Sequence, residues 1–435
     1  MVNVNIILSA VNAPTGMWPA ILNWIEASVV NYGWVIILFT LLVKACLSPL
    51  DLLIKFTTKK TTLVQQKLAP QIARLNKKYA NDKQSLQMQT NALYKKEGYN
   101  IFGSCIVTLV NLVVTMVVFF TLFASLRTMS AYKAITQYDQ MQTAYLNTIE
   151  KTAKTNFNST LVENGYDLDS KDDIKAILYG NEASEDQIEK NGYLYYFFSA
   201  NSVSDEKLDQ MRTSLSNEIA YDEVSVYAVL ESATTASIPT AEAEVNKIWN
   251  NVKDKWLWIE NIWVTDDYKS PLPTYDNLKS MANSSKVKEY QTYVENTNQT
   301  LYNNVTNSVN SQNHRWNGYF ILAILAAVTS FLSQWITEKL SKSKNKAVNK
   351  LTESTTQAGG AMKFMKFLLP AIMVIFVMTS SSAFGLYIVS SAIISIGISA
   401  LTSLIVNAVY KKKEEEIVAG LEREALRSMK KINKK

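Results

Sequence analysis

The sequence predicts an all-α polytopic membrane protein with a five-helix transmembrane core, a cytoplasmic helical hairpin and a large extracytoplasmic α or α+β insertion. Three observations predict this class. The apolar residues gather in five stretches, the charge of the segments between them alternates in sign, and one His with two Cys leaves little for a metal site or disulfide framework. The mean hydropathy of −0.03 is therefore an average over very different segments.

Five stretches are candidate spans because a helix needs about 20 mostly apolar residues to cross a bilayer. The expected spans are residues 33–50, 103–127, 317–337, 364–380 and 384–409. The last two are so close in sequence that they form a tight hairpin. The alternative, buried helices of a soluble protein, fits poorly because a chain of 435 residues could hardly bury five such runs.

The charges of the intervening segments predict the topology, because cytoplasmic loops carry excess Lys and Arg. Residues 51–102, 338–366 and 410–435 together hold 26 Lys or Arg and 10 Asp or Glu, whereas residues 128–316 hold 16 and 27. We therefore expect the first three segments inside and residues 128–316 outside. This places the N-terminus outside and the C-terminus in the cytoplasm of a multi-pass plasma-membrane protein.

Residues 1–32 are expected to form an extracytoplasmic segment. Within it, Trp18, Leu22 and Ile25 recur at helical spacing, which is typical of an amphipathic helix lying in the outer membrane interface. Residues 1–16 are equally consistent with a frayed extension of the first span.

The segment 51–102 predicts an antiparallel helical hairpin, with helices near 51–79 and 83–96 and a turn at Asn81 and Asp82. Its outer face is basic through Lys59, Lys60, Lys67, Arg74, Lys77 and Lys78. Such a face suits anionic lipid headgroups, with an acidic protein or RNA partner as alternatives. A solvated loop without function is the simpler interpretation.

The segment 128–316 is acidic and rich in Tyr, Asn and Ser, which predicts a small folded insertion domain. Residues 193–198 favour a strand, residues 205–220 favour a helix, and residues 280–312 favour polar helix or partial disorder. The role of the domain is open between binding substrate ectodomains, binding a translocon partner and capping the outer face. Residues 338–363 are expected to form a cytoplasmic loop, and 410–435 a basic cytoplasmic tail.

Lys44 is the residue that carries most information about function. It lies ten residues after Trp34 and thus about 15 Å along the helix, near the middle of the bilayer. A Lys at that depth costs about 2.5–3.5 kcal/mol on insertion scales, so it normally faces a cavity. No Asp or Glu lies in another expected span, which predicts a water-filled pocket with an uncompensated positive charge. Snorkelling of the side chain towards the inner interface is the alternative.

Other polar residues of the expected spans are candidates to line the same groove, although Ser and Thr in membrane helices often only pack helices together. They are Asn111, Thr115, Ser330, Gln334, Ser395 and Thr402.

A hydrated, positively charged pocket open to the cytoplasm would attract an acidic peptide segment and ease its passage into the bilayer. This chemistry needs no nucleophile, metal or cofactor, so we expect neither an enzyme nor a small-molecule substrate. One alternative is an anion channel or carrier, but such carriers usually show repeated halves and this chain shows no repeat. Another is a non-catalytic assembly factor of a translocon.

Several stretches also carry a family pattern. They are NYGWVIILFTLLVKACLSPL (31–50), APQIARLNKKYANDKQSLQMQTNALYKKEGYNIFGSC (69–105), WLWIENIW (256–263), AAVTSFLSQWIT (326–337) and FLLPAIMVIFVMTSSSAFGLYIVSSAIISI (367–396). In order and spacing they resemble the YidC/Oxa/Alb family of membrane protein insertases, over roughly residues 17–128 and 254–412. Lys44 stands where this family usually has Arg.

The resemblance implies an insertase that receives nascent membrane proteins in the groove and releases their transmembrane segments into lipid without ATP. The implied partners are nascent membrane proteins and membrane lipids, with the Sec translocon and, through the tail 410–435, the ribosome as further candidates. For the tail, an ordinary positive-inside anchor is the alternative. Ile101, Ile106 and Val113 depart from Pro-containing family patterns, and Lys44 lacks the planar fork of Arg, which indicates a divergent bacterial member.

Overall fold

The computed structural model describes residues 11–29, 31–97, 101–163, 226–312, 316–341 and 359–432. Within these ranges the regular secondary structure is helical, apart from one isolated antiparallel bridge between Trp256 and Ile259, and turns and loops connect the helices. The all-α class is thus confirmed for the described residues. The strand expected at 193–198 and the helix expected at 205–220 lie outside them.

The chain divides into two units, which we describe separately. Unit 1 comprises residues 1–19 and 126–319, and unit 2 comprises residues 20–125 and 320–435. The helix α4 (Ile101–Glu163) contributes residues to both units.

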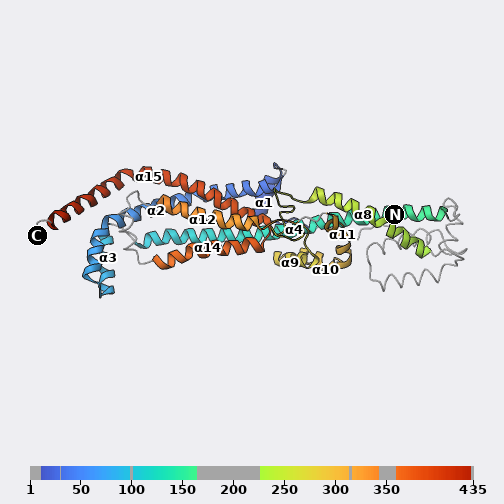
Figure 1. The fold of residues 1–435 in the computed structure, drawn as a ribbon, viewed down its shortest axis with the longest axis horizontal. Helices are drawn as coiled ribbons and strands as arrows, with labels where there is room; N and C mark the ends of the chain where they lie inside the picture. Colours follow the sequence, from blue (N-terminus) through green and yellow to red (C-terminus); the bar gives the residue numbers. More distant parts are fainter. Residues whose placement is uncertain are drawn as a thin grey trace. The chain divides into compact units, whose positions relative to one another are not determined.

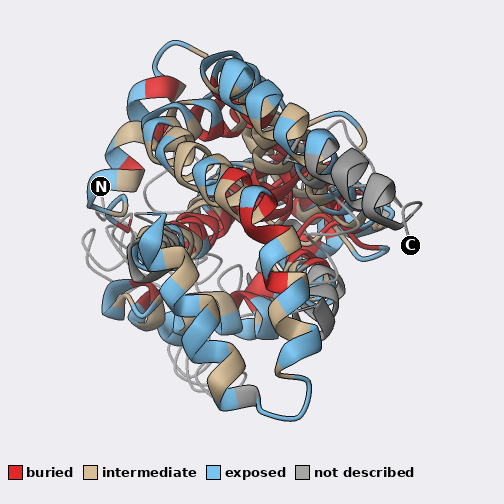
Figure 2. Cartoon of the chain, turned by 90° about the vertical axis from the view of Figure 1, so that its left-hand side faces the viewer, coloured by how far each residue is buried: buried red, intermediate tan, exposed pale blue. Residues whose placement is uncertain are grey.

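Unit 2 contains the apolar helices that position the candidate site. Besides the first part of α4, they are α2 (Tyr32–Lys78), α12 (Ile321–Ser341), α14 (Gly359–Thr379) and α15 (Ser382–Ile432). α15 packs along α2 and α12, and α12 also packs on α14 (Figure 1). Figure 2 colours each residue by its burial, and the helices in front at the bottom of the view are mostly exposed or intermediate.

Aromatic rings join α4 to α14 and α15 in unit 2. Phe123 lies edge-to-face against Phe384 of α15 and Phe376 of α14, with ring centroids 4.8 Å and 5.4 Å apart. Phe119, one helical turn earlier, contacts the same two rings at 5.9 Å and 6.0 Å. Such pairs add about 0.5–1.5 kcal/mol each beyond the area they bury.

The helices of unit 2 continue beyond the expected span boundaries. α2 does not end near residue 50 but passes through Pro49 and Pro70 to Lys78, because no Gly interrupts this stretch. A proline inside a helix removes one backbone hydrogen bond, and packing against α15 offsets that loss. The expected turn of the hairpin does appear, since α3 (Lys83–Lys96) begins after Asp82, whose carboxylate accepts a hydrogen bond from the Ser85 amide at 3.0 Å.

Three described helices are long and apolar enough to cross a membrane, namely those spanning Tyr32–Lys78, Leu109–Ile149 and Ser382–Leu421. Two shorter apolar helices, Ile321–Thr337 and Pro370–Thr379, coincide with the remaining expected spans. A helix near the start, α1 (Met17–Glu26), buries Leu22 and Ile25 and leaves Trp24 exposed.

Unit 1 is built on the second part of α4. Its buried residues recur every three or four positions, as expected for one helix face, at Ala131, Ala134, Ile135, Tyr138, Met141, Tyr145 and Ile149. This face shares a core with α8 (Val226–Val252), α9 (Tyr275–Ser285), α10 (Lys288–Asn296) and α11 (Gln299–Gln312). The core includes several tyrosines that keep their hydroxyl groups hydrogen-bonded, such as Tyr302, which donates to the Pro273 carbonyl at 2.6 Å.

Gly318 gives a test of the packing in unit 1. The Tyr319 amide donates to the buried Asp266 carboxylate at 2.9 Å, and a Cβ added at Gly318 would overlap that carboxylate. We therefore expect Gly318→Ala to lower the free energy of unfolding by about 1–3 kcal/mol, measured by thermal unfolding of the full chain in detergent.

The matched control is Gly397→Ala, because a Cβ at Gly397 in α15 would meet no atom within 4 Å. This variant should unfold at the same or a slightly higher temperature, since Ala favours helix over Gly. Equal unfolding temperatures for the two variants would show that the overlap of the added Cβ with Asp266 does not destabilise the protein.

Candidate functional site

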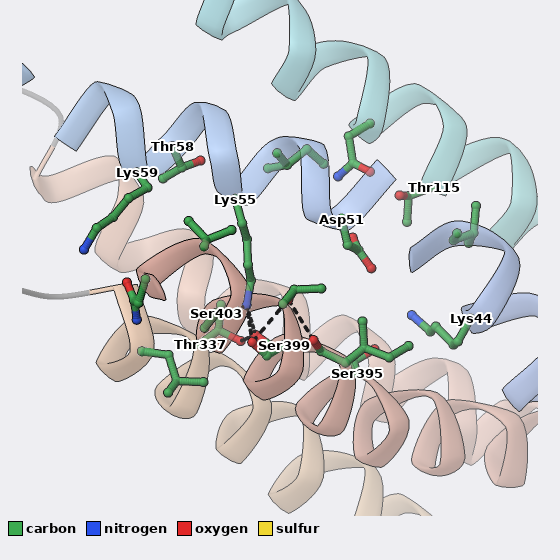
Figure 3. Close-up of a pocket in the computed structure, with 18 of the residues that line it drawn as sticks. Lys44, Asp51, Lys55, Thr58, Lys59, Thr115, Thr337, Ser395, Ser399 and Ser403 are labelled. Atoms are coloured by element: carbon green, nitrogen blue, oxygen red, sulfur yellow. Dashed lines mark hydrogen bonds between the residues drawn. The ribbon is translucent and has the colours of Figure 1, made fainter. Parts of the chain in front are cut away.

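Unit 2 contains a cavity of about 480 Å³ bordered by α2, α4, α12 and α15 (Figure 3). Most of its lining side chains can donate or accept hydrogen bonds, which is unusual among helices this apolar. The polar lining comprises Lys44, Asp51, Lys55, Thr58, Lys59, Thr62, Asn111, Thr115, Thr337, Ser395, Ser399, Thr402, Ser403 and Asn407. The cavity is not sealed, because Thr115 and Asn407 are exposed.

A smaller cavity of about 250 Å³ adjoins the first, and the two share Lys44, Leu47 and Thr115. Its other polar side chains are Ser330, Ser333, Gln334, Tyr387 and Ser391. Lys44 therefore borders both cavities and can reach polar groups of either.

The structure brings the seven groove residues expected from the sequence to these two cavities. Lys44, Asn111, Thr115, Ser395 and Thr402 line the larger one, whereas Ser330 and Gln334 join Lys44 and Thr115 at the smaller one.

The six basic residues expected on the hairpin all lie on α2. Lys59 lines the larger cavity, and the other five, Lys60, Lys67, Arg74, Lys77 and Lys78, are exposed.

One face of α2 carries most of the charge in the larger cavity. Lys44, Asp51, Lys55 and Lys59 follow one another at spacings of seven, four and four residues, which places them on the same side of a helix. Sequence reasoning missed Asp51 and Lys55 because it ended the first span at residue 50. The periodic signal was present and becomes visible once the helix is continued through Pro49.

Asp51 changes the expected electrostatics of the site. Figure 3 shows Lys44 and Asp51 projecting from α2 into the same space and towards each other. The prediction that the positive charge of Lys44 is uncompensated is therefore wrong, because a carboxylate shares its cavity and attracts it. In the part of the chain that the structure describes, neither group forms a direct ion pair, so both depend on the cavity for solvation.

The ammonium group of Lys55, in contrast, forms hydrogen bonds with α15. It donates to the Ser399 carbonyl at 2.5 Å, to the Ser399 hydroxyl at 2.7 Å and to the Ser403 hydroxyl at 2.7 Å. A Lys ammonium has three donors, so each donor has an acceptor here. Thr337 of α12 lies 3.2 Å from the Ser399 hydroxyl, which connects a third helix to this cluster.

Further contacts between α2 and α15 follow one turn later. Lys59 pairs with Glu414 at 2.8 Å, both side chains being largely buried, and the rings of Phe56 and Tyr410 lie 6.1 Å apart. We call the contacts of Lys55 and Lys59 with α15 the α2–α15 clasp. The clasp fixes one end of the cavity with charged hydrogen bonds. Among the residues that the structure describes, Lys44 and Asp51 at the other end form no such bond.

Comparisons with known proteins find sequence similarity over part of the chain. The family model "60Kd inner membrane protein" matches residues 24–178. The chain is 33% identical over 118 residues to "Membrane protein insertase YidC" of Aromatoleum aromaticum, an alignment that covers 27% of this chain and 20% of that protein. Over about a quarter of its length, the chain is thus a distant homologue of proteins named YidC insertase.

Two further relatives bear the same name. That of Chlorobaculum parvum is 32% identical over 107 residues, covering 25% of this chain and 18% of the relative. That of Fusobacterium nucleatum is 37% identical over 107 residues, covering 25% and 48%. The chain thus spans from about a fifth to about half of the length of these relatives, and no solved structure matches it.

The range matched by the family model contains all of α2, α3 and α4, and hence Lys44, Asp51, Asn111 and Thr115. The lining residues of α12 and α15 lie outside it, as does the wider resemblance expected over residues 254–412. The half of the cavity formed by α2 and α4 therefore lies within the homologous segment, and the other half rests on the structure of this chain.

The contribution of the α2–α15 clasp to stability can be tested directly. Replacing Lys55 by Met removes three hydrogen bonds to α15 while keeping an unbranched side chain, so we expect the free energy of unfolding to fall by about 1.5–3 kcal/mol. Thermal unfolding of the full chain in lipid nanodiscs measures this loss.

Lys60→Met is the matched control because Lys60 lies on the same helix and is exposed. It should leave the unfolding temperature unchanged. If Lys55→Met unfolds at the same temperature as the control, the clasp does not stabilise unit 2.

Proposed function

We propose that this chain is a membrane protein insertase that receives the polar end of a nascent membrane protein in the cavity at Lys44 and releases its transmembrane segment into lipid. The observation that carries the proposal is the position of Lys44. It borders a hydroxyl-rich cavity of about 480 Å³ within a unit of apolar helices, inside the segment homologous to the YidC/Oxa family. The similarity to proteins named membrane protein insertase supports the same function.

The proposed topology has five spans, at residues 33–50, 103–127, 317–337, 364–380 and 384–409, in a plasma membrane. The N-terminus and the insertion 128–316 lie outside, and the hairpin 51–102, the loop 338–363 and the tail 410–435 lie in the cytoplasm. The charge balance of these segments supports this orientation. The three long apolar helices are consistent with the first, second and fifth spans.

In the proposed mechanism, the cavity replaces part of the water around a short polar tail. Side chains such as Asn111, Thr115 and Ser395 exchange hydrogen bonds with the peptide, and Lys44 attracts its carboxylates. Asp51 opposes this attraction, so the cavity favours tails acidic enough to displace Asp51 as the partner of Lys44. No covalent bond forms or breaks, and the proposal includes no enzymatic step.

The driving force for release is burial of the apolar surface of the substrate, about 25 cal/mol for each Å² removed from water. The outer faces of two helices offer a path for a transmembrane segment, because their large apolar side chains are exposed. They are Leu112, Met116, Val117 and Phe120 on α4 and Ile324, Val328, Phe331 and Leu332 on α12.

The proposed partners are nascent membrane proteins and membrane lipids. The basic tail 410–435 is a candidate contact for ribosomal RNA by its charge, and a Sec translocon is a candidate neighbour by the family relation alone. An anion channel remains the competing function. The names of the relatives, which are insertases, favour insertion over conduction.

Insertion into liposomes that contain only this protein tests the proposal. A small single-span substrate with an acidic tail should insert when the wild-type chain or Lys44→Arg is present, and roughly tenfold less with Lys44→Glu, equivalent to about 1.4 kcal/mol. Asp51→Asn should increase insertion of the same substrate, because it removes the charge that competes for Lys44. Protease protection of the translocated tail measures the yield.

The control is the same substrate with a neutral tail, which should respond little to either substitution. Each variant is first compared with the wild type by thermal unfolding, so that loss of folding is separated from loss of insertion. Unaltered insertion of the acidic tail by a folded Lys44→Glu protein would contradict the proposed role of this charge. No insertion by the wild-type chain would contradict the insertase function itself.

A further inference from the structure

A tight turn in unit 1 presents an apolar side chain to the exterior. The amides of Trp256 and Ile259 donate to each other's carbonyl groups, both at 2.9 Å, and Leu257 lies at the tip between two tryptophans. The side chain of Leu257 is 62% exposed, and its φ of +49° is in the left-handed region that non-glycine residues rarely adopt. The backbone at Leu257 is therefore locally strained, in a conformation that leaves the leucine side chain exposed.

The base of this turn is rigid. Glu260 is buried, and it pairs with Lys253 at 3.0 Å and with Lys255 at 2.8 Å. Burial alone would raise the pKa of Glu260, but hydrogen bonds from Lys255 and Lys253 lower it to about 2, so the carboxylate is ionised at neutral pH. The Trp263 indole nitrogen donates to Asp254, which closes the other side of the loop. These contacts prevent Leu257 from collapsing onto the protein.

Hydrogen bonds also connect the turn to the residues that lead into α12. The Glu260 amide donates to the Asn317 carbonyl at 3.3 Å, and the Asn261 amide donates to the Asn317 side chain at 2.7 Å. Asn317 precedes the first residue of α12, Ile321, by only four positions. If α12 spans the membrane, the turn is held close to the level at which the chain enters it.

Three exposed aromatic rings surround the same entry point. Tyr268 and Trp316 are each 51% exposed and Tyr319 is 45% exposed. The ring centroids of Tyr268 and Trp316 lie 4.9 Å apart. The ring centroid of Tyr319 lies 5.8 Å from that of Tyr268 and 5.9 Å from that of Trp316. Trp and Tyr are enriched where membrane meets water, because their rings are apolar and carry one polar group. We call these three residues the aromatic triad.

We propose that the Leu257 turn and the aromatic triad form a lipid-binding surface, which inserts into the headgroup region of the outer leaflet and holds unit 1 on the bilayer. The partner is the phospholipid bilayer rather than a protein, because both groups are tied by hydrogen bonds or by sequence to the start of an apolar helix. A rigid aliphatic tip flanked by tryptophans suits a shallow, non-specific acyl environment. The inference requires α12 to span the membrane and does not depend on the insertase function.

A fluorescent probe at position 257 tests this surface in the full chain. Cys46 and Cys105 are replaced by Ser, Leu257→Cys is labelled with an environment-sensitive dye, and the protein is reconstituted in phosphatidylcholine nanodiscs. We expect a blue-shifted emission, quenching by lipids that carry a spin label near the headgroup, and at least fivefold weaker quenching by aqueous iodide than at a control position.

The control is Thr300→Cys, which is exposed on α11 and lies about 20 Å along that helix from its end nearest Trp316. Its dye should be quenched by iodide and not by spin-labelled lipid. Equal iodide quenching at positions 257 and 300 would overturn the proposal, and so would a dye at 257 that neither quencher reaches, since that result indicates burial in protein. If Leu257→Cys does not fold, Trp316→Cys in the aromatic triad is labelled instead, and the same quenching results support or overturn the proposal.

Discussion

The arrangement of unit 2 depends on where the charges on one face of α2 find partners. Lys44, Asp51, Lys55 and Lys59 lie on this face, and an uncompensated charge among apolar helices in a bilayer would cost several kcal/mol. The structure meets that constraint in two ways. Lys55 and Lys59 are bound to α15, and Lys44 and Asp51 share a cavity lined by hydroxyl and amide groups.

This division explains why the cavity lies where it does. The α2–α15 clasp satisfies its charges with fixed protein partners, so it stabilises the packing of the two longest apolar helices of the unit. Among the described residues, Lys44 and Asp51 form no such contact, and both side chains line the cavity. The function we propose requires groups whose partners can be exchanged as a peptide binds and leaves, and this pair meets that requirement.

The sequence predicted the helical class, the apolar stretches and seven polar residues that line the two cavities, because an apolar stretch and a polar residue within it are local signals. Asp51 and Lys55 were missed because the first span was expected to end at residue 50, whereas the helix continues through Pro49 and packs against α15. The clasp could not be predicted from local pattern, since Lys55 and Ser399 are 344 residues apart and their pairing depends on which face α15 turns to α2. The turn at Leu257 could not be predicted, because its positive φ and the exposure of its side chain leave no periodic pattern in the sequence.

Chemical accessibility of position 44 tests the central claim, a hydrated cavity around this residue, most directly. In a chain with Cys46 and Cys105 replaced by Ser, Lys44→Cys is exposed to a membrane-impermeant thiol reagent on the side of the membrane that bears α3. The controls are Lys60→Cys, on the exposed extension of α2, and Leu38→Cys, on its exposed apolar face. The account predicts that positions 44 and 60 react and position 38 does not. An unreactive Cys at position 44 beside a reactive one at position 60 would contradict it.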